Sequence, residues 1–472
     1  MKLKQMRTRI ISIFLIMVAA LGIGALLIPG QEIKGLISKG DKPAIAVPDF
    51  RGAGEAQRFM DTFNATLWDQ LAGSGVLKMV AKSYYPLEVP QQPQDFKPPT
   101  TIAPAVPGRR GDAAKPQSNG PWLTDWSNPP VSANDLAFGY TAVQNGQLVL
   151  RGWLYNLAQP DPQSAQVIGK LYFGTLDAEG AKKVAREFAA DILQFFGAKS
   201  LAGTKIYFVS DRSGAKEIWS MDYDGSNQRE LTHYKSVSTM PTTSADGRLF
   251  AFTTYAQGNP KIMVYSADTD RRLPFINPVS SAVETPEFTP DGRRLMFAAS
   301  LEGWVQICIA DANGGGMRRI SHVRAIEVSP KINPKNANEV VFISGRGGSE
   351  QLWRMNIDGG DLEMLTSGQG YVANPSWSPS GQLVAFAWTL GYEPGNYNIF
   401  VMDVASKKYV QLTHGSGRNE NPWWAPDGVH IVFSSKQRQV TQLYTMLADG
   451  TGAQQLTTQG NNIQPVWSKA IN

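Results

Sequence analysis

The stretch Pro422-Trp-Trp-Ala-Pro-Asp-Gly428 decides the fold, because the same motif recurs along the second half of the chain. Strong copies are Pro286-Glu-Phe-Thr-Pro-Asp-Gly292 and Pro375-Ser-Trp-Ser-Pro-Ser-Gly381, and weaker copies begin at Pro241, Pro330 and Pro465. Successive copies start 43 to 47 residues apart. A steady period of this length is typical of proteins that repeat one supersecondary unit.

Each repeat predicts four short strands. The motif leads into an apolar strand such as Leu383-Val-Ala-Phe386, a third strand such as Asn398-Ile-Phe-Val-Met402 follows, and the fourth ends in a pair such as Leu412-Thr413. Four strands in about 45 residues form a propeller blade, which must pack against a neighbour on each side. We therefore expect blades rather than an open solenoid, whose unpaired ends would need capping repeats.

The order of elements predicts how the ring closes. The repeat region opens at Lys205 on the second strand of a blade and ends with a lone first strand at 465–468. Pairing these two strands leaves no open edge. We therefore expect an all-β six-bladed β-propeller over residues 204–472, closed by the C-terminal strand.

Residues 43–197 predict an α/β domain that precedes the ring. A short apolar strand at 44–47 is followed by a helix in which Phe59, Phe63 and Leu67 recur every four residues. Asn145-Gly146 separates two strands of a hairpin, since both residues tolerate the positive φ angles of a tight turn. A second amphipathic helix is expected over 177–196.

A proline-rich insertion interrupts this domain at residues 86–130. It holds eleven prolines among Gln, Gly, Ser and Lys. Proline removes backbone donors and fixes φ. We therefore expect an extended or disordered spacer here rather than packed structure.

The N-terminus predicts export from the cytoplasm. The uncharged run 10–28 follows Lys2, Lys4, Arg7 and Arg9, which is the pattern of a signal sequence. Residues 1–30 are thus a cleaved signal peptide or an uncleaved N-terminal membrane anchor. These four charges account for most of the net charge of +5. A nearly neutral remainder does not favour a nucleic-acid partner.

Catalytic and cofactor motifs are missing from the sequence. We find no G-x-S-x-G, H-E-x-x-H or G-x-x-x-x-G-K-[ST] pattern. The single cysteine, Cys308, excludes an intrachain disulfide. His233, His322 and His414 each follow the end of a fourth strand, where exposed polar residues are expected more than metal ligands. We therefore expect no cofactor and no enzyme activity.

The residues just before each motif proline are the candidate binding residues, because they enter the innermost strand beside the central channel and loops on a rigid scaffold commonly bind partners. Three of them, Glu284, Glu327 and Glu420, also form a weak candidate cation site. The candidate partner-binding residues are Glu284, Thr285, Glu327, Asn374, Arg418, Asn419, Glu420, Asn461 and Asn462.

The order of an export signal, an α/β domain and six repeats of P-x-W-S-P-D-G, I-[YF]-x-M-D and L-T resembles the TolB family of the Tol–Pal system. The resemblance implies a monomeric, non-catalytic periplasmic scaffold that binds the lipoprotein Pal through the propeller and TolA through the N-terminal domain. Such proteins keep the outer membrane attached and help it constrict at division. The resemblance matches Glu284 and the 418–421 loop most closely to the Pal contact. The alternative is an exported propeller enzyme or glycan-binding protein with a ligand site at the channel.

Overall fold

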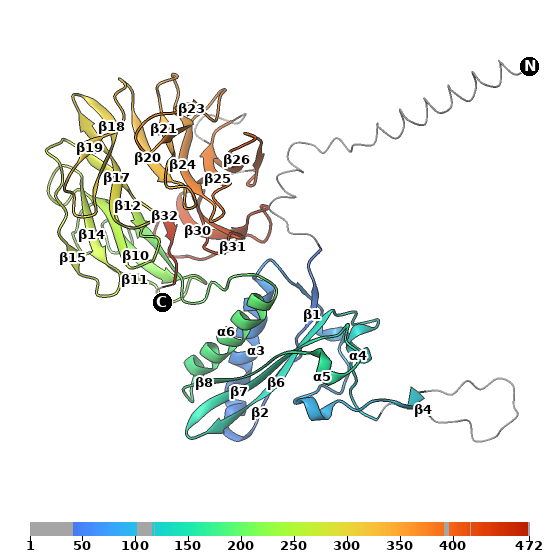
Figure 1. Cartoon of the computed structure of the whole chain (residues 1–472). Helices are drawn as coiled ribbons and strands as arrows, with labels where there is room; N and C mark the ends of the chain where they lie inside the picture. Colours follow the sequence, from blue (N-terminus) through green and yellow to red (C-terminus); the bar gives the residue numbers. More distant parts are fainter. Residues whose placement is uncertain (1–40, 102–115, 118, 391–395, 416, 471–472) are drawn as a thin grey trace, which may run out of the picture.

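The computed structural model describes residues 41–101, 116–117, 119–390, 396–415 and 417–470 (Figure 1). The expected signal peptide or anchor at 1–30 lies outside these residues. None of the helices in the described part of the chain has the length and apolarity that a membrane crossing requires.

A mixed sheet forms the N-terminal domain, in the order β3-β1-β6-β7-β8, with β2 also paired to β6. Strand β1 pairs in parallel with both β3 and β6, and β2 also pairs in parallel with β6. The pairs β6–β7 and β7–β8 are antiparallel. The tight turn of the β6–β7 hairpin has positive φ at Asn145 and Gly146, as expected. The strands are β1 (Ala44–Ala46), β2 (Arg51–Gly52), β3 (Lys78–Met79), β6 (Asp135–Gln144), β7 (Gln147–Asn156) and β8 (Gln166–Gly174).

Two helices, α3 (Met60–Ala72) and α6 (Ala178–Phe195), cover one face of this sheet (Figure 1). Their apolar stripes supply buried residues such as Phe63, Leu67 and Phe188 to the core, which also holds Leu150 of β7. The Asp177 carboxylate accepts a hydrogen bond from the Gly180 N–H at 2.7 Å and so caps the start of α6. The α/β character predicted from the sequence is confirmed.

The described parts of the proline-rich insertion cover part of the other face of the sheet, so the expectation of an unpacked spacer is wrong for them. Phe96 lies 5.4 Å from Phe138 and 5.5 Å from Tyr155, measured between ring centroids. Trp126 is completely buried in the same cluster. These aromatic anchors make the insertion a packed layer because burying them outweighs the lack of regular hydrogen bonding. Its short elements, with those near it, are η1 (Gly54–Phe59), η2 (Lys82–Tyr84), η3 (Pro93–Asp95), β4 (Thr100–Thr101), β5 (Pro116–Gln117), α4 (Thr124–Ser127) and α5 (Pro162–Ala165).

Six four-stranded sheets follow in the described part of residues 205–467 and confirm the expected propeller (Figure 1). From the channel outward, the strands are β32 (Asn462–Trp467), β9 (Lys205–Ser210), β10 (Glu217–Asp222) and β11 (Arg229–Glu230) in blade one; β12 (Ser238–Thr243), β13 (Leu249–Thr254), β14 (Lys261–Ser266) and β15 (Arg272–Leu273) in blade two; β16 (Val283–Phe288), β17 (Arg294–Leu301), β18 (Trp304–Asp311) and β19 (Arg318–Arg319) in blade three; β20 (Glu327–Ile332), β21 (Glu339–Ser344), β22 (Gln351–Asn356) and β23 (Glu363–Met364) in blade four; β24 (Val372–Trp377), β25 (Leu383–Trp388), β26 (Asn398–Asp403) and β27 (Tyr409–Gln411) in blade five; and β28 (Arg418–Trp424), β29 (His430–Gln437), β30 (Val440–Leu447) and β31 (Gln454–Gln455) in blade six.

The C-terminal strand closes the ring as predicted. Strand β32 pairs antiparallel with β9, with Ile463 opposite Val209 and Trp467 opposite Ile206. The Trp467 indole N–H also donates to the Thr204 hydroxyl at 2.9 Å. The first blade therefore contains strands from both ends of the propeller sequence.

The aromatic residues of four of the six motifs pack between blades. Trp424 is buried with Ala385 and Val401 of the preceding blade, and Trp377 with Val341. Phe288 and Trp467 occupy the equivalent places in their own blades. Their regular spacing thus reflects packing and not a ligand site.

The Leu-Thr pair has a structural explanation in its hydroxyl. In blade four the Thr366 hydroxyl accepts the Leu352 N–H at 2.9 Å and donates to the Gln351 side chain at 2.8 Å. The Thr366 hydroxyl thus joins the segment after the fourth strand to the third strand, beyond the last main-chain pair between these two strands. The equivalent hydroxyls are Thr232, Ser321, Thr413 and Thr457. Blade two lacks the pair and uses the Asn277 side chain, which bonds both backbone groups of Ile262.

The two domains contact each other at the end of α3. The His430 ring lies between two acceptors, with Nδ1 2.6 Å from Asp427 Oδ2 and Nε2 2.7 Å from the Gly73 carbonyl oxygen. Burial opposes protonation of His430, but the hydrogen bond and charge of Asp427 outweigh it and raise the histidine pKa. An Arg186–Asp224 ion pair at 3.0 Å adds a second link between the domains.

Candidate functional site: the mouth of the propeller channel

Six residues, one before each motif proline, adopt a left-handed backbone at the channel. Their φ angles run from 52° to 55°. Each lies where the register between the first and second strands of its blade shifts, which marks a β-bulge. The bulge turns these residues and their prolines toward a narrow cavity of about 70 Å³. The six are Met240, Thr285, Ser329, Asn374, Asn421 and Gln464.

Three residues that stand one place after a motif proline, Thr242, Glu287 and Lys331, form a closed polar cluster in the channel. Lys331 Nζ lies 2.6 Å from Glu287 Oε2, and both side chains are about seven-eighths buried. The same carboxylate oxygen accepts from the Thr242 hydroxyl at 3.0 Å. Lys331 Nζ also lies 4.2 Å from the centre of the Trp423 ring. This buried pair already satisfies its own charges, so the channel interior is not a free charged site.

The mouth faces away from the N-terminal domain. The turns that end the innermost strands, at Pro379 and Gly428, line a cavity together with Lys42 and Gly75 of the N-terminal region. The loops before the prolines lie at the opposite ends of the same strands. A partner at the mouth would therefore approach from the side opposite the α/β domain.

Four of the predicted residues are accessible at the mouth. Glu284 accepts a hydrogen bond from the Tyr255 hydroxyl at 2.9 Å. Arg418 Nε lies 2.5 Å from Glu420 Oε2, and the arginine side chain is 48% exposed. The Asn461 side chain donates to Asp211 at 2.9 Å. These side chains are fixed in place but keep hydrogen-bonding capacity for a partner.

Two further predicted residues, Thr285 and Asn374, line the channel cavity itself. The Thr285 hydroxyl accepts from the Ser329 N–H at 3.3 Å, across adjacent blades. The Asn374 side-chain oxygen accepts from Asn421 at 3.3 Å. A partner contact with either residue would require a group small enough to enter the mouth.

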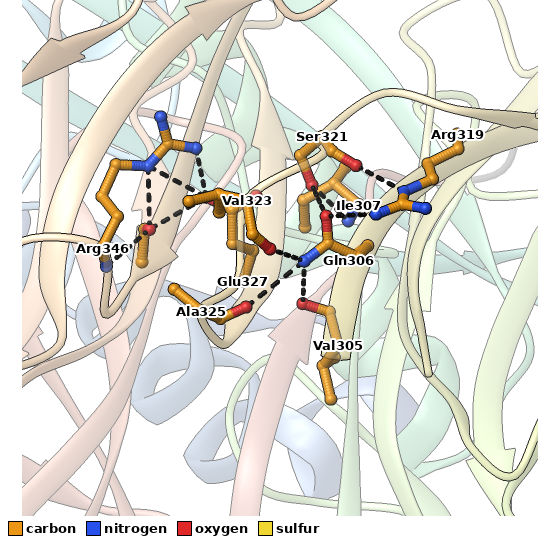
Figure 2. Close-up of polar contacts among 10 residues, drawn as sticks. Val305, Gln306, Ile307, Arg319, Ser321, Val323, Ala325, Glu327 and Arg346 are labelled. Carbon is orange, nitrogen blue, oxygen red and sulfur yellow. Dashed lines mark hydrogen bonds and ion pairs between the residues drawn. The ribbon is translucent and has the colours of Figure 1, made fainter. Parts of the chain in front are cut away.

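The remaining three predicted residues, Glu327, Asn419 and Asn462, are buried and serve the fold. Figure 2 shows the Glu327 carboxylate beside the guanidinium of Arg346, with which it forms an ion pair while also accepting from the Ser344 hydroxyl. Glu327 is fully buried, and its second carboxylate oxygen has no hydrogen-bond partner among the described residues. A partner cannot touch Glu327 while the ring is closed.

Asn462 repeats this arrangement in blade one. Arg212 donates to its side-chain oxygen at 2.9 Å, and the Asn462 amide donates to Gln442 at 2.9 Å. Asn419 is 6% exposed and donates to Asn398 at 3.3 Å. Side chains at this position hold the start of the innermost strand against its own blade.

A second buried network lies next to Glu327, across the boundary between blades three and four (Figure 2). The Gln306 amide nitrogen donates to the carbonyl oxygens of Val323 at 2.5 Å and Ala325 at 3.3 Å. Arg319 donates to the Ser321 carbonyl oxygen at 2.8 Å. These bonds fix the loop that leads from one blade to the next mouth residue.

The candidate cation site is not assembled. Of Glu284, Glu327 and Glu420, the second pairs with Arg346 and the third with Arg418. Over the described residues, no group of three or more His, Cys, Asp or Glu side chains is placed to hold a metal ion.

His233, expected to be exposed, has a side chain that is 71% accessible.

The sequence reasoning missed the Lys331–Glu287 pair and His430. Glu287 and Lys331 each follow a motif proline directly, so the repeat alignment already placed them at one level of the ring. Opposite charges at equivalent positions of adjacent blades were the available signal. No comparable signal existed for His430, because its partner at Gly73 is 357 residues away.

Comparison with known proteins agrees with this architecture. Residues 192–391 and 365–471 match the family described as TolB beta propeller domain. A TolB homolog of Chlorobium luteolum is 32% identical over 340 residues, which is 72% of this chain and 75% of that protein. A TolB homolog of Chlorobium chlorochromatii is 33% identical over 211 residues, or 44% of this chain and 46% of that protein.

Solved structures show the same fold. The crystal structure of TolB from Acinetobacter baumannii superposes with a TM-score of 0.70 at 18% identity, covering 92% of this chain and 98% of that one. This superposition spans both the α/β domain and the ring. The family-model match across the repeats and the 32% identity over 72% of the chain lead to one assignment: the chain belongs to the TolB family.

Proposed function

We propose that this protein is a non-catalytic periplasmic scaffold of the Tol–Pal system. The observation that carries the proposal is family membership over 72% of the chain at 32% identity. The sequence also lacks the nucleophile and metal motifs of common hydrolases. The expected role is to keep the outer membrane attached and to support its constriction at division.

The propeller mouth binds the lipoprotein Pal, and the N-terminal domain contacts TolA. Support for the first contact comes from Glu284 and the Arg418–Glu420 pair, which are accessible and held by hydrogen bonds on one rigid face. Preorganised side chains reduce the entropy lost on binding. The buried residues Glu327, Asn419 and Asn462 are left out of this contact surface.

Capture of purified Pal on immobilised protein tests the proposal. Glu284→Arg combined with Arg418→Glu should weaken capture by about tenfold or more. Each reversed side chain would then face a group on the partner that carries the same sign of charge. Arg293→Glu, an exposed charge reversal in the turn between β16 and β17, is the matched control and should bind as the unaltered protein does. Equal capture by all three proteins would refute the assigned face. Binding of muropeptides or sugars without Pal would instead favour the glycan-binding alternative.

A further inference from the structure

One half of the N-terminal sheet face opposite α3 and α6 is not covered by the described insertion. The insertion reaches the row of Phe138, which stacks on Trp153 with ring centroids 5.7 Å apart. The next row along the strands pairs Arg51 of β2, Tyr140 of β6, Arg151 of β7 and Leu171 of β8. Because directly paired residues project from the same side of a sheet, these four side chains share one face.

This open face carries apolar and aromatic groups. Leu171 is 44% exposed and Phe173, two residues further along β8, is 45% exposed. The Tyr140 ring lies 6.3 Å from the Trp153 ring, and both are half-buried. Apolar side chains grouped on one surface are a common mark of an interaction site.

Strand β8 is also an open edge. It pairs with β7 on one side only, at the end of the sheet order. Lys183 donates to the Phe173 carbonyl oxygen at 3.0 Å, and the other main-chain groups that point away from β7 have no protein partner among the described residues. An edge strand with free donors and acceptors is a template for an added strand.

The charge of this face is positive and uncompensated. Arg51 and Arg151 are exposed, and neither forms an ion pair within the described chain. The Arg151 guanidinium lies 5.8 Å from the Tyr140 ring centre. A carboxylate is the group that matches an unpaired guanidinium in both charge and geometry. If a second copy of this chain paired through β8, Arg51 and Arg151 of each copy would still lack a carboxylate partner.

We propose that β8 accepts an extended segment of a partner protein whose side chains alternate between acidic and apolar along one face. The segment adds to β8 as a further strand, its apolar side chains contact Leu171 and Phe173, and its carboxylates extend toward Arg151 of β7, two strands away. Arg51 lies two strands further from the added segment and contributes to the positive charge of the face without contacting it. The open main-chain groups of β8 favour a peptide over an anionic lipid surface, since a peptide can satisfy them along the whole edge. This surface is separate from the propeller mouth and does not depend on the proposed function.

The test uses the full chain and a fluorescein-labelled peptide, Ser-Glu-Thr-Val-Thr-Glu-Thr-Val-Ser, with a second peptide in which Lys replaces both Glu. Fluorescence anisotropy should show binding of the acidic peptide. Arg151→Glu should weaken that binding about tenfold and improve binding of the Lys peptide, since the charge is reversed on both sides. Hydrogen exchange should slow in residues 166–174 when the acidic peptide is bound.

Arg293→Glu on the propeller is the charge-matched control and should bind the acidic peptide normally. A second variant, Leu171→Ser, should weaken binding of both peptides without changing their charge preference. Equal binding by the Arg151→Glu and Arg293→Glu proteins, or slowed exchange elsewhere than in β8, would overturn the proposal. So would the absence of peptide binding up to about 1 mM together with Arg151-dependent binding to phosphatidylglycerol vesicles, which would identify a lipid surface.

Discussion

Asp135, at the start of β6, carries a buried carboxylate that lacks a compensating partner. It is 4% exposed, and its Oδ1 atom has no hydrogen-bond partner among the described residues. Desolvation raises its pKa from 3.8 to about 6. Replacing it with the neutral isostere in Asp135→Asn should therefore stabilise the N-terminal domain at neutral pH.

The sign and size follow from proton linkage. Below pH 3.8 the carboxyl group is protonated in both the folded and the unfolded state, so the native residue costs nothing through its charge. As pH rises from 3.8 to 6 the unfolded state ionises first, and folding is penalised progressively. Above pH 6 the penalty levels off at about 3 kcal/mol, since each pKa unit corresponds to about 1.4 kcal/mol. The gain from Asp135→Asn should be about 2 kcal/mol at pH 5 and about 3 kcal/mol above pH 7.

Native-state hydrogen exchange of peptides from residues 135–156 measures this gain locally, without requiring the two domains to unfold together. At pH 7.5 exchange in Asp135→Asn should be slower by roughly two orders of magnitude than in the unaltered protein at the same pH. Glu88→Gln, an exposed carboxylate of the same domain, is the control and should change little. A gain that does not vary between pH 5 and pH 7.5, or a loss of protection at pH 7.5, would refute the argument from desolvation.

Three further perturbations test the ring and the domain contact. Deleting residues 464–472 removes most of β32, so the ring should lose its cooperative melting transition in circular dichroism; an unchanged transition would contradict closure by this strand. Arg346→Met leaves the buried Glu327 carboxylate unpaired and should cost about 3–5 kcal/mol in urea unfolding, whereas adding Glu327→Met should restore most of it. His430→Phe should lower the melting temperature most below about pH 6.5, because a raised histidine pKa stabilises the folded state there and that stability is lost as pH rises through the folded pKa. If His430→Phe lowers the melting temperature equally at pH 6 and pH 9, the His430 ring is not protonated in its contact with Asp427 and the Gly73 carbonyl oxygen.

The ring was predictable because its determinants are local and repeated. Each of the three strong copies supplies a proline, an interblade aromatic residue and a turn within seven residues, and all six copies start 43 to 47 residues apart. Closure followed from counting strands at both ends, since a missing first strand at Lys205 and an extra one at Pro465 complement each other. None of these inferences required knowledge of a distant contact.

The insertion was misjudged because composition outweighed individual residues. Eleven prolines dominate 86–130, yet Phe96, Leu123 and Trp126 are the residues that decide its structure. Proline excludes regular pairing but does not exclude burial of a neighbouring ring. Three large apolar side chains in a polar stretch were the signal of packing.

The repeat pattern predicted that the candidate residues lie at one mouth of the channel, but it did not predict which of them are buried. Glu327 and Asn462 stand three places before a motif proline, as Val283 does, but their environments depend on an arginine after the second strand. Both of these blades contain Ser-x-Arg, at 210–212 and 344–346. A polar residue before the proline combined with Ser-x-Arg in the same blade would have identified them as structural.

The channel residues show why the mouth can vary without loss of the fold. All six positions before the prolines hold φ near 50°, although they carry five different residue types. A left-handed backbone costs an L-residue about 1–2 kcal/mol, and among these types only asparagine eases that cost. The conformation is therefore imposed by the bulge and the ring, since Met240, Thr285 and Gln464 adopt it as Asn374 does. Because the backbone holds its geometry whichever side chain is present, the side chains at the mouth are free to be selected for a partner, which is where a rigid scaffold places recognition.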